Sequence, residues 1–147
     1  MTRLPESSSR CTADIRTAVD ALNRGQVDEY LRCFSAQSLR WIDGIDAAIS
    51  LTEVESNLRH LLSAFEDVRL AEELLFGTDR HVCAHWRMAG RHVGEYFGIA
   101  PTGREIDVRL CEVYEFDAGK VTTTWIHGDP MVLFRQIEMP ADSGGRQ

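Results

Sequence analysis

The sequence lacks long apolar runs, an excess of basic residues and a secretion signal. A membrane-spanning helix needs about 18 or more consecutive apolar residues, and every apolar stretch here is shorter, so we expect no transmembrane segment. The 16 basic residues against 23 acidic ones give a net charge of −7, which argues against nucleic-acid binding because phosphate recognition needs a basic face. The first ten residues have no apolar centre of a signal peptide, and the expected compartment is therefore the cytoplasm.

Closely spaced cysteines are also missing. The four cysteines, at positions 11, 33, 83 and 111, include no Cys-x-x-Cys pair, which favours free thiols over a disulfide framework. His81, Cys83 and His85 alternate along a predicted strand, and alternate positions can supply ligands to zinc. No further ligand cluster lies nearby in the sequence, so we favour an outer sheet face, with a dimer contact as one use of it.

At 147 residues, the chain is long enough to bury a real core in one domain. Hydrophobic residues make up 44% and charged residues 27%, as in ordinary globular proteins. We predict a disordered lead-in over residues 1–10, a single domain over residues 11–139 and a loose tail over residues 140–147.

Helical spacing of apolar residues predicts three helices in the first half of the chain. The first extends from about Thr12 to Asn23, and the second covers Val27–Phe34. Thr52 with Glu55 fits a capping box at the start of the third, which ends around residues 66–67. Residues 45–51 remain unassigned.

The period then changes from helical to alternating. After a brief strand at residues 39–42, strands are predicted at residues 68–76, 81–88, 105–116 and 120–128. Helices followed by strands indicate an α+β domain, in which helices pack on one face of a curved antiparallel sheet.

The densest group of polar residues lies at the end of the last predicted strand. Trp125, His127 and Asp129 occupy alternate positions, so we predict that they share one face and line a pocket. A carboxylate there could move a proton. Alternatively, Asp129 caps a turn at residues 131–136, with Pro130 at the first helical position.

Several stretches together resemble the SnoaL-like polyketide cyclases of the nuclear transport factor two-like superfamily. They are Phe65-Glu66-Asp67, the segment Gly90–Arg104, the turn Asp117–Lys120, and Trp125 followed four residues on by Asp129. The resemblance covers about residues 12–138. It implies a cone-shaped α+β barrel, with three N-terminal helices packed against a strongly curved antiparallel or mixed sheet that encloses a cavity.

The resemblance also implies a reaction. Members close a ring of an aromatic polyketide by intramolecular aldol condensation, without metal or organic cofactor, and an aspartate after the tryptophan on the last strand is the base. Asp129 matches that position, although the following Pro130 departs from the family pattern. The expected partners are a small hydrophobic, polyketide-like substrate and a second copy in a homodimer, with no nucleic acid and no membrane.

The other candidate residues have supporting roles in this hypothesis. His127 assists Asp129, while Trp125, Trp86 and Met88 shape the cavity. Two further candidates are Tyr114, which shares strand parity with Glu112 and could donate to an oxyanion, and His92. For Tyr114 we favour a buried ring, and for His92 a role in holding a bent strand by hydrogen bonds over a place in the pocket.

Two classes of function stay open at this point. The first is a cofactor-independent cyclase-type enzyme with Asp129 as general base. The second is a non-catalytic small-molecule-binding or dimerisation module of the same fold. A third variant keeps the enzyme but changes the reaction to isomerisation, epoxide hydrolysis or cofactor-free hydroxylation.

Overall fold

Four helices and six strands make up residues 6–138, the part of the chain that the computed structural model describes. The helices are α1 (Glu6–Asn23), α2 (Val27–Leu31), α3 (Leu51–Ala64) and α4 (Val132–Glu138). The strands are β1 (Phe34–Ile42), β2 (Ile49–Ser50), β3 (Phe65–Gly77), β4 (His81–His92), β5 (Glu105–Asp117) and β6 (Lys120–His127). Within residues 6–138, no helix combines the length and apolar character needed to cross a membrane.

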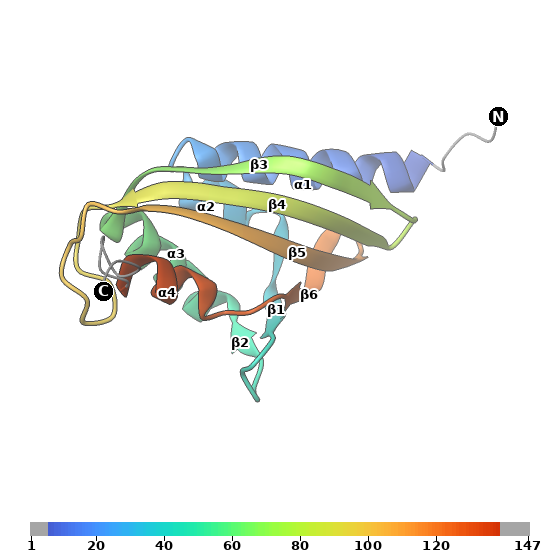
Figure 1. Cartoon of the computed structure of the whole chain (residues 1–147). Helices are drawn as coiled ribbons and strands as arrows, with labels where there is room; N and C mark the ends of the chain where they lie inside the picture. The colour runs from blue at the N-terminus through green and yellow to red at the C-terminus, as the bar shows by residue number, and fades with distance from the viewer. Residues whose placement is uncertain (1–5, 139–147) are drawn as a thin grey trace.

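All six strands belong to one sheet, in the order β2-β1-β6-β5-β4-β3. β1 runs parallel to β6, and every other neighbouring pair is antiparallel. Figure 1 shows α1 running along the long strands, with α3 and α4 below the left-hand part of β3, β4 and β5. The predicted α+β class, with helices on a curved mixed sheet, is confirmed.

The first helix begins earlier than the sequence pattern indicates. α1 starts at Glu6, so the predicted disordered lead-in is wrong over residues 6–10, while residues 1–5 and the predicted tail lie outside the described residues. α2 ends at Leu31, and Phe34 already belongs to β1. The sequence pattern places Phe34 in a helix because its spacing from Tyr30 fits a helical face as well as it fits the start of a strand.

The third helix is capped two residues before the predicted position. The Ser50 hydroxyl accepts a hydrogen bond from the Glu53 N–H at 3.3 Å, and the Glu53 carboxylate accepts one from the Ser50 N–H at 3.0 Å. This reciprocal pair is a capping box, which satisfies two backbone donors that the helix itself leaves free. Ser50 therefore caps α3, and Thr52 is helical.

Side-chain alternation gives the sheet two distinct faces. The face toward the helices, called the inner face here, carries buried residues such as Val82, Ala84, Trp86 and Met88 of β4. The opposite, outer face carries the intervening positions, which are exposed or half-buried. The core lies between the inner face and α1, where Ile15 is 1% exposed.

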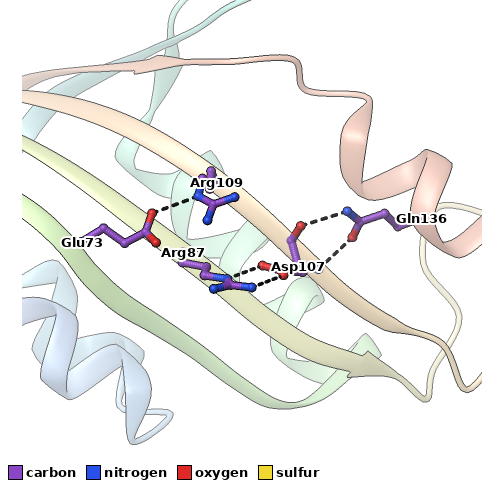
Figure 2. A network of polar contacts seen from close by, with 5 residues as sticks. All are labelled: Glu73, Arg87, Asp107, Arg109 and Gln136. Atoms are coloured by element: carbon purple, nitrogen blue, oxygen red, sulfur yellow. Dashed lines mark hydrogen bonds and ion pairs between the residues drawn. The ribbon is translucent and has the colours of Figure 1, made fainter.

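The chain turns sharply after β6 to form α4, where the sequence pattern indicated only a turn at residues 131–136 capped by Asp129, and the Met131 N–H does donate to the Asp129 carboxylate. Gly128, with φ of +142°, makes this turn. β6 pairs with β5 only over Cys111–Asp117. Along the earlier residues of β5, α4 packs beside the strand instead. The Gln136 amide accepts from the Asp107 N–H at 2.8 Å and donates to the Asp107 C=O at 2.9 Å, as Figure 2 shows. The side chain of Gln136 thus replaces a missing strand partner.

Candidate functional site

A cavity of about 200 Å³ lies between the inner face and the helices. Most of its wall is apolar and comes from three helices and the sheet: Val19 and Leu22 of α1, Leu58, Leu61 and Leu62 of α3, Leu133 of α4, and Met88, Leu110 and Ile126 of the sheet. An apolar cavity of about 150 Å³ is large enough to bind benzene, so this one admits a compound of one or two small rings.

The polar part of the cavity wall is concentrated on the sheet. Arg40 of β1 and Glu112 of β5 both line the cavity, and both are buried, with 8% and 6% exposure. Strand pairing explains why they lie close together: Arg40 pairs with Thr124 of β6, and Glu112 pairs with Ile126, the next inner-face residue of the same strand. A cation and an anion thus lie on neighbouring inner-face rows.

Each of the two charged groups has a tyrosine beside it. The Arg40 Nη2 donates to the Tyr30 hydroxyl at 2.9 Å. The Tyr114 hydroxyl donates to the Glu112 carboxylate and accepts from the Trp86 Nε1 at 3.1 Å. Because buried polar groups are costly without partners, these bonds hold the charges in fixed positions.

Electrostatics keep both tyrosines in the donor form. Burial raises the pKa of Tyr30, against the opposing effect of the Arg40 charge. Burial, and next the negative charge of Glu112, raise the pKa of Tyr114 well above its ordinary value. Both phenols are therefore protonated at neutral pH and can donate hydrogen bonds.

Arg40 and Glu112 both line the cavity without contacting each other directly. Within residues 6–138, Arg40 makes no direct ion pair with Glu112, although their charges are close enough for Glu112 to help raise the pKa of Arg40 against the lowering effect of burial. The Thr124 hydroxyl on the same inner face is buried and has no hydrogen-bond partner among the described residues. Such a cluster can bind a polar group, such as a carbonyl oxygen, at one side of an apolar guest.

The structure brings some of the predicted site residues to this cavity. Met88 lines it directly. Trp86 and Tyr114 are buried behind it and orient Glu112 through the hydrogen bonds described above. His92 is fully buried away from the lining, where its Nδ1 lies 2.9 Å from the Thr102 Oγ1 and accepts from the Thr102 N–H at 3.2 Å. His92 therefore holds the loop after β4 to the strand.

Two predicted site residues lie on the other side of the sheet. Trp125 pairs with Val113, and His127 pairs with Cys111, on the face opposite to Glu112 and Ile126. Neither of them lines the cavity, so that prediction is wrong for Trp125, while His127 borders a separate small hollow that it shares with Asp129. His127 is exposed, and its Nδ1 lies 3.3 Å from the Asp43 carboxylate.

Asp129 lies outside the apolar chamber that the sequence pattern predicted for it. Its side chain is 50% exposed, and its carboxylate accepts from the Arg135 guanidinium at 2.5 Å and from the Met131 N–H at 2.9 Å. The hydrogen bond from Arg135, then that from Met131, lowers the pKa of Asp129, the opposite of what burial would do. Asp129 nevertheless borders a shallow hollow that shares Ile42 with the cavity wall.

Sequence reasoning missed Arg40, Tyr30 and Glu112 as site residues. A signal for Glu112 exists in the alternation of β5, where its inner-face positions form the series Ile106, Val108, Leu110, Glu112, Tyr114 and Phe116. One carboxylate in an otherwise apolar and aromatic series is a candidate for a functional position. Arg40 gives a weaker signal, because Ser38 is also a buried position of β1, so the arginine does not interrupt an otherwise apolar series.

A curled sheet that closes over a cavity with helices defines a class of small α+β proteins that bind compounds between the two layers. Within that class, the profile of the SnoaL-like polyketide cyclases matches residues 13–137. The chain belongs to this family. No curated protein matches the sequence significantly.

Crystal structures of distant relatives share the fold. AclR, a hydroxylase candidate from Streptomyces galilaeus, is 23% identical, with a TM-score of 0.79 over 87% of this chain and 94% of its own. A candidate SnoaL-like polyketide cyclase from Jannaschia sp. CCS1 is 14% identical, with a TM-score of 0.84 over 95% and 99%. IdmH, a candidate polyketide cyclase from Streptomyces antibioticus, is 17% identical, with a TM-score of 0.73 over 86% and 96%. At these identities, the likeness concerns the fold.

Proposed function

We propose that this protein is a cofactor-independent enzyme of the cyclase type, which removes a proton next to a carbonyl group of a small apolar substrate. The observation that carries the proposal is the buried pair of Arg40 and Glu112 in an apolar cavity. An aldol ring closure needs a base for the carbon-bound proton and a donor for the oxygen that becomes negative. A cyclised polyketide-like ring system, a cytoplasmic location and a homodimer belong to the same proposal.

Glu112 is the base in this proposal. Among the described residues, it is the single acidic side chain of the cavity wall. Arg40, supported by Tyr30, stabilises the developing enolate oxygen, because a fixed positive charge in a site of low dielectric constant acts strongly on a new negative charge. Tyr114 is a positioning residue that keeps the Glu112 carboxylate turned toward the cavity.

Asp129 is the alternative base. It can serve only after Arg135 has released its carboxylate, since a carboxylate that holds two donors is a poor proton acceptor. The apolar hollow beside it, which includes Ile42 and Ile126, gives a substrate in the cavity a route to Asp129. The two assignments predict different outcomes for two conservative variants.

The test uses 2-acetylnaphthalene and acetophenone as probe ketones. Deuterium uptake from D₂O at the carbon next to the carbonyl is followed by NMR, with wild type, Glu112→Gln and Asp129→Asn compared at equal concentration. We expect wild type to accelerate exchange and Glu112→Gln to lose roughly 10²–10⁴-fold of that acceleration, the usual contribution of a general base. Asp129→Asn should retain it.

Three other outcomes would change the conclusion. Exchange that survives in Glu112→Gln but disappears in Asp129→Asn would assign the base to Asp129. Exchange that is unchanged in both variants would remove both residues from the chemistry. Saturable binding of the probes without any acceleration by wild type would favour a small-molecule-binding module, a function compatible with Glu112 and Asp129 both being occupied by internal donors.

A further inference from the structure

Three metal-ligating side chains converge on the outer face, on the opposite side of the sheet from the cavity. Cys83 and His85 are two residues apart on β4, and Cys111 is the cross-strand partner of His85 on β5. Their sulfur and ring nitrogen atoms all lie within 4.8 Å of one another. His85 is exposed and both cysteines are half-buried, so the group is accessible from solvent.

The chemistry of these donors selects a soft divalent cation. Thiolates and imidazole are the usual ligands of Zn²⁺, with bonds of about 2.3 Å to sulfur and about 2.0 Å to nitrogen. In a tetrahedral site, such bonds place the donor atoms roughly 3.5–3.8 Å apart. The three donor atoms lie within 4.8 Å of one another, so binding requires their separations to shorten by at most roughly 1 Å.

We propose that Cys83, His85 and Cys111 bind one soft divalent cation such as Zn²⁺, with a water molecule in the fourth position. On binding, each cysteine gives its thiol proton to the solvent, and the imidazole binds in its neutral form. The cation links β4 to β5 on the outer face. Three protein ligands and one open position are also the arrangement in which zinc accepts exogenous ligands.

One other histidine and one other cysteine lie outside the proposed site. His81, which completes a His-x-Cys-x-His pattern in the sequence, is held by Glu115, with its Nε2 3.1 Å from the carboxylate, and does not join the cluster. All four cysteines are free, and Cys33 lies elsewhere, half-buried near α1, where its Sγ is 4.0 Å from the Asp14 C=O. His81 and Cys33 therefore offer matched controls for the histidine and the cysteine ligands.

The experiment titrates the reduced, metal-free full chain with Co²⁺ and then displaces it with Zn²⁺. We expect one Co²⁺ per chain, with thiolate-to-cobalt charge-transfer absorption and the visible bands of tetrahedral cobalt. Cys83→Ser, Cys111→Ser and His85→Ala should each weaken binding by at least about 100-fold, because even the loss of an outer-shell partner weakens metal sites by roughly 10–100-fold. His81→Ala and Cys33→Ser should bind as wild type does.

Circular dichroism separates loss of the site from loss of the fold in each variant. A wild-type chain with no charge-transfer band would overturn the proposal. So would a band that survives both Cys83→Ser and Cys111→Ser, or one that disappears equally in the control variants. Rapid closure of a Cys83–Cys111 disulfide in the metal-free chain, with no protection by Zn²⁺, would assign the pair to thiol oxidation instead.

Discussion

The hydroxyl of Tyr114 is the link whose removal tests the buried polar cluster most directly. It donates to Glu112 and accepts from Trp86, and the ring is 1% exposed. Tyr114→Phe removes the oxygen and keeps the ring, so the packing of the core stays close to that of wild type. Any loss of stability then reports on the hydrogen bonds.

Both bonds contribute to the expected magnitude. A hydrogen bond to a charged group contributes about 1.5–3 kcal/mol, and a buried N–H left without a partner costs about 1–3 kcal/mol. Tyr114→Phe removes both the hydrogen bond to Glu112 and the acceptor for the Trp86 N–H. We therefore expect it to lower the free energy of unfolding by about 3–5 kcal/mol. This is a large part of the roughly 5–15 kcal/mol that a typical domain has.

Urea unfolding followed by far-UV circular dichroism and tryptophan fluorescence measures this change. The dependence of the free energy on urea should keep the same slope, because the surface exposed on unfolding hardly changes. Tyr96→Phe is the matched control: its ring is half-buried, and its hydroxyl makes no hydrogen bond within residues 6–138. We expect that variant to lie within about 0.5 kcal/mol of wild type.

A double-mutant cycle of Tyr114→Phe with Glu112→Leu, which removes the acceptor, then isolates the pair itself. Residues that share a buried hydrogen bond have interaction energies of about 0.5–3 kcal/mol, and we expect a value near the upper end. The reasoning is refuted if Tyr114→Phe loses no more stability than Tyr96→Phe. It is also refuted if the two substitutions are additive, because Glu112 would then not depend on Tyr114.

Two further predictions concern the connection from β6 to α4. Because Arg135 lowers the pKa of Asp129 below its ordinary 3.8, Asp129 contributes stability above the unfolded pKa and loses it as the pH falls through the folded value. In urea unfolding, Asp129→Asn should therefore be less stable than wild type at neutral pH and as stable as wild type at strongly acidic pH. A difference in urea midpoint that persists at strongly acidic pH would contradict this. Gln136→Ala removes both hydrogen bonds to Asp107, so we expect a loss of about 1–2 kcal/mol in urea unfolding, whereas an unchanged midpoint would show that water replaces them fully.

Most of the helices and strands could be predicted from local sequence patterns. The helical spacing of Ile15, Val19 and Leu22 and the alternation of β4 depend only on neighbours along the chain, and the structure follows both. The start of α3 was misplaced because Ser50 and Thr52 both precede an acid by three residues, and only the tertiary setting of β2 decides between them.

The site was harder to predict because it depends on how strands pair across the sheet. Arg40 and Glu112 are far apart in the sequence, and they meet only because β1 pairs in parallel with β6, which in turn pairs with β5. No local pattern reports a parallel pairing between the first and last long strands. Cys111 joins Cys83 and His85 on the outer face through the antiparallel pairing of β5 with β4, whose register a single strand does not report.

The misplacement of Trp125, His127 and Asp129 shows which step of the reasoning failed. Alternation correctly put Trp125 and His127 on one face, but it cannot say whether that face is inner or outer. The answer comes from β5: Glu112 is buried and pairs with Ile126, so the positions on either side of Ile126 face outward. Alternation also ends where the strand ends. Gly128 turns the chain out of β6, so the parity of Asp129 carries no information about its direction. Hydrogen bonds from Met131, just before α4, and from Arg135 within α4 fix that direction instead.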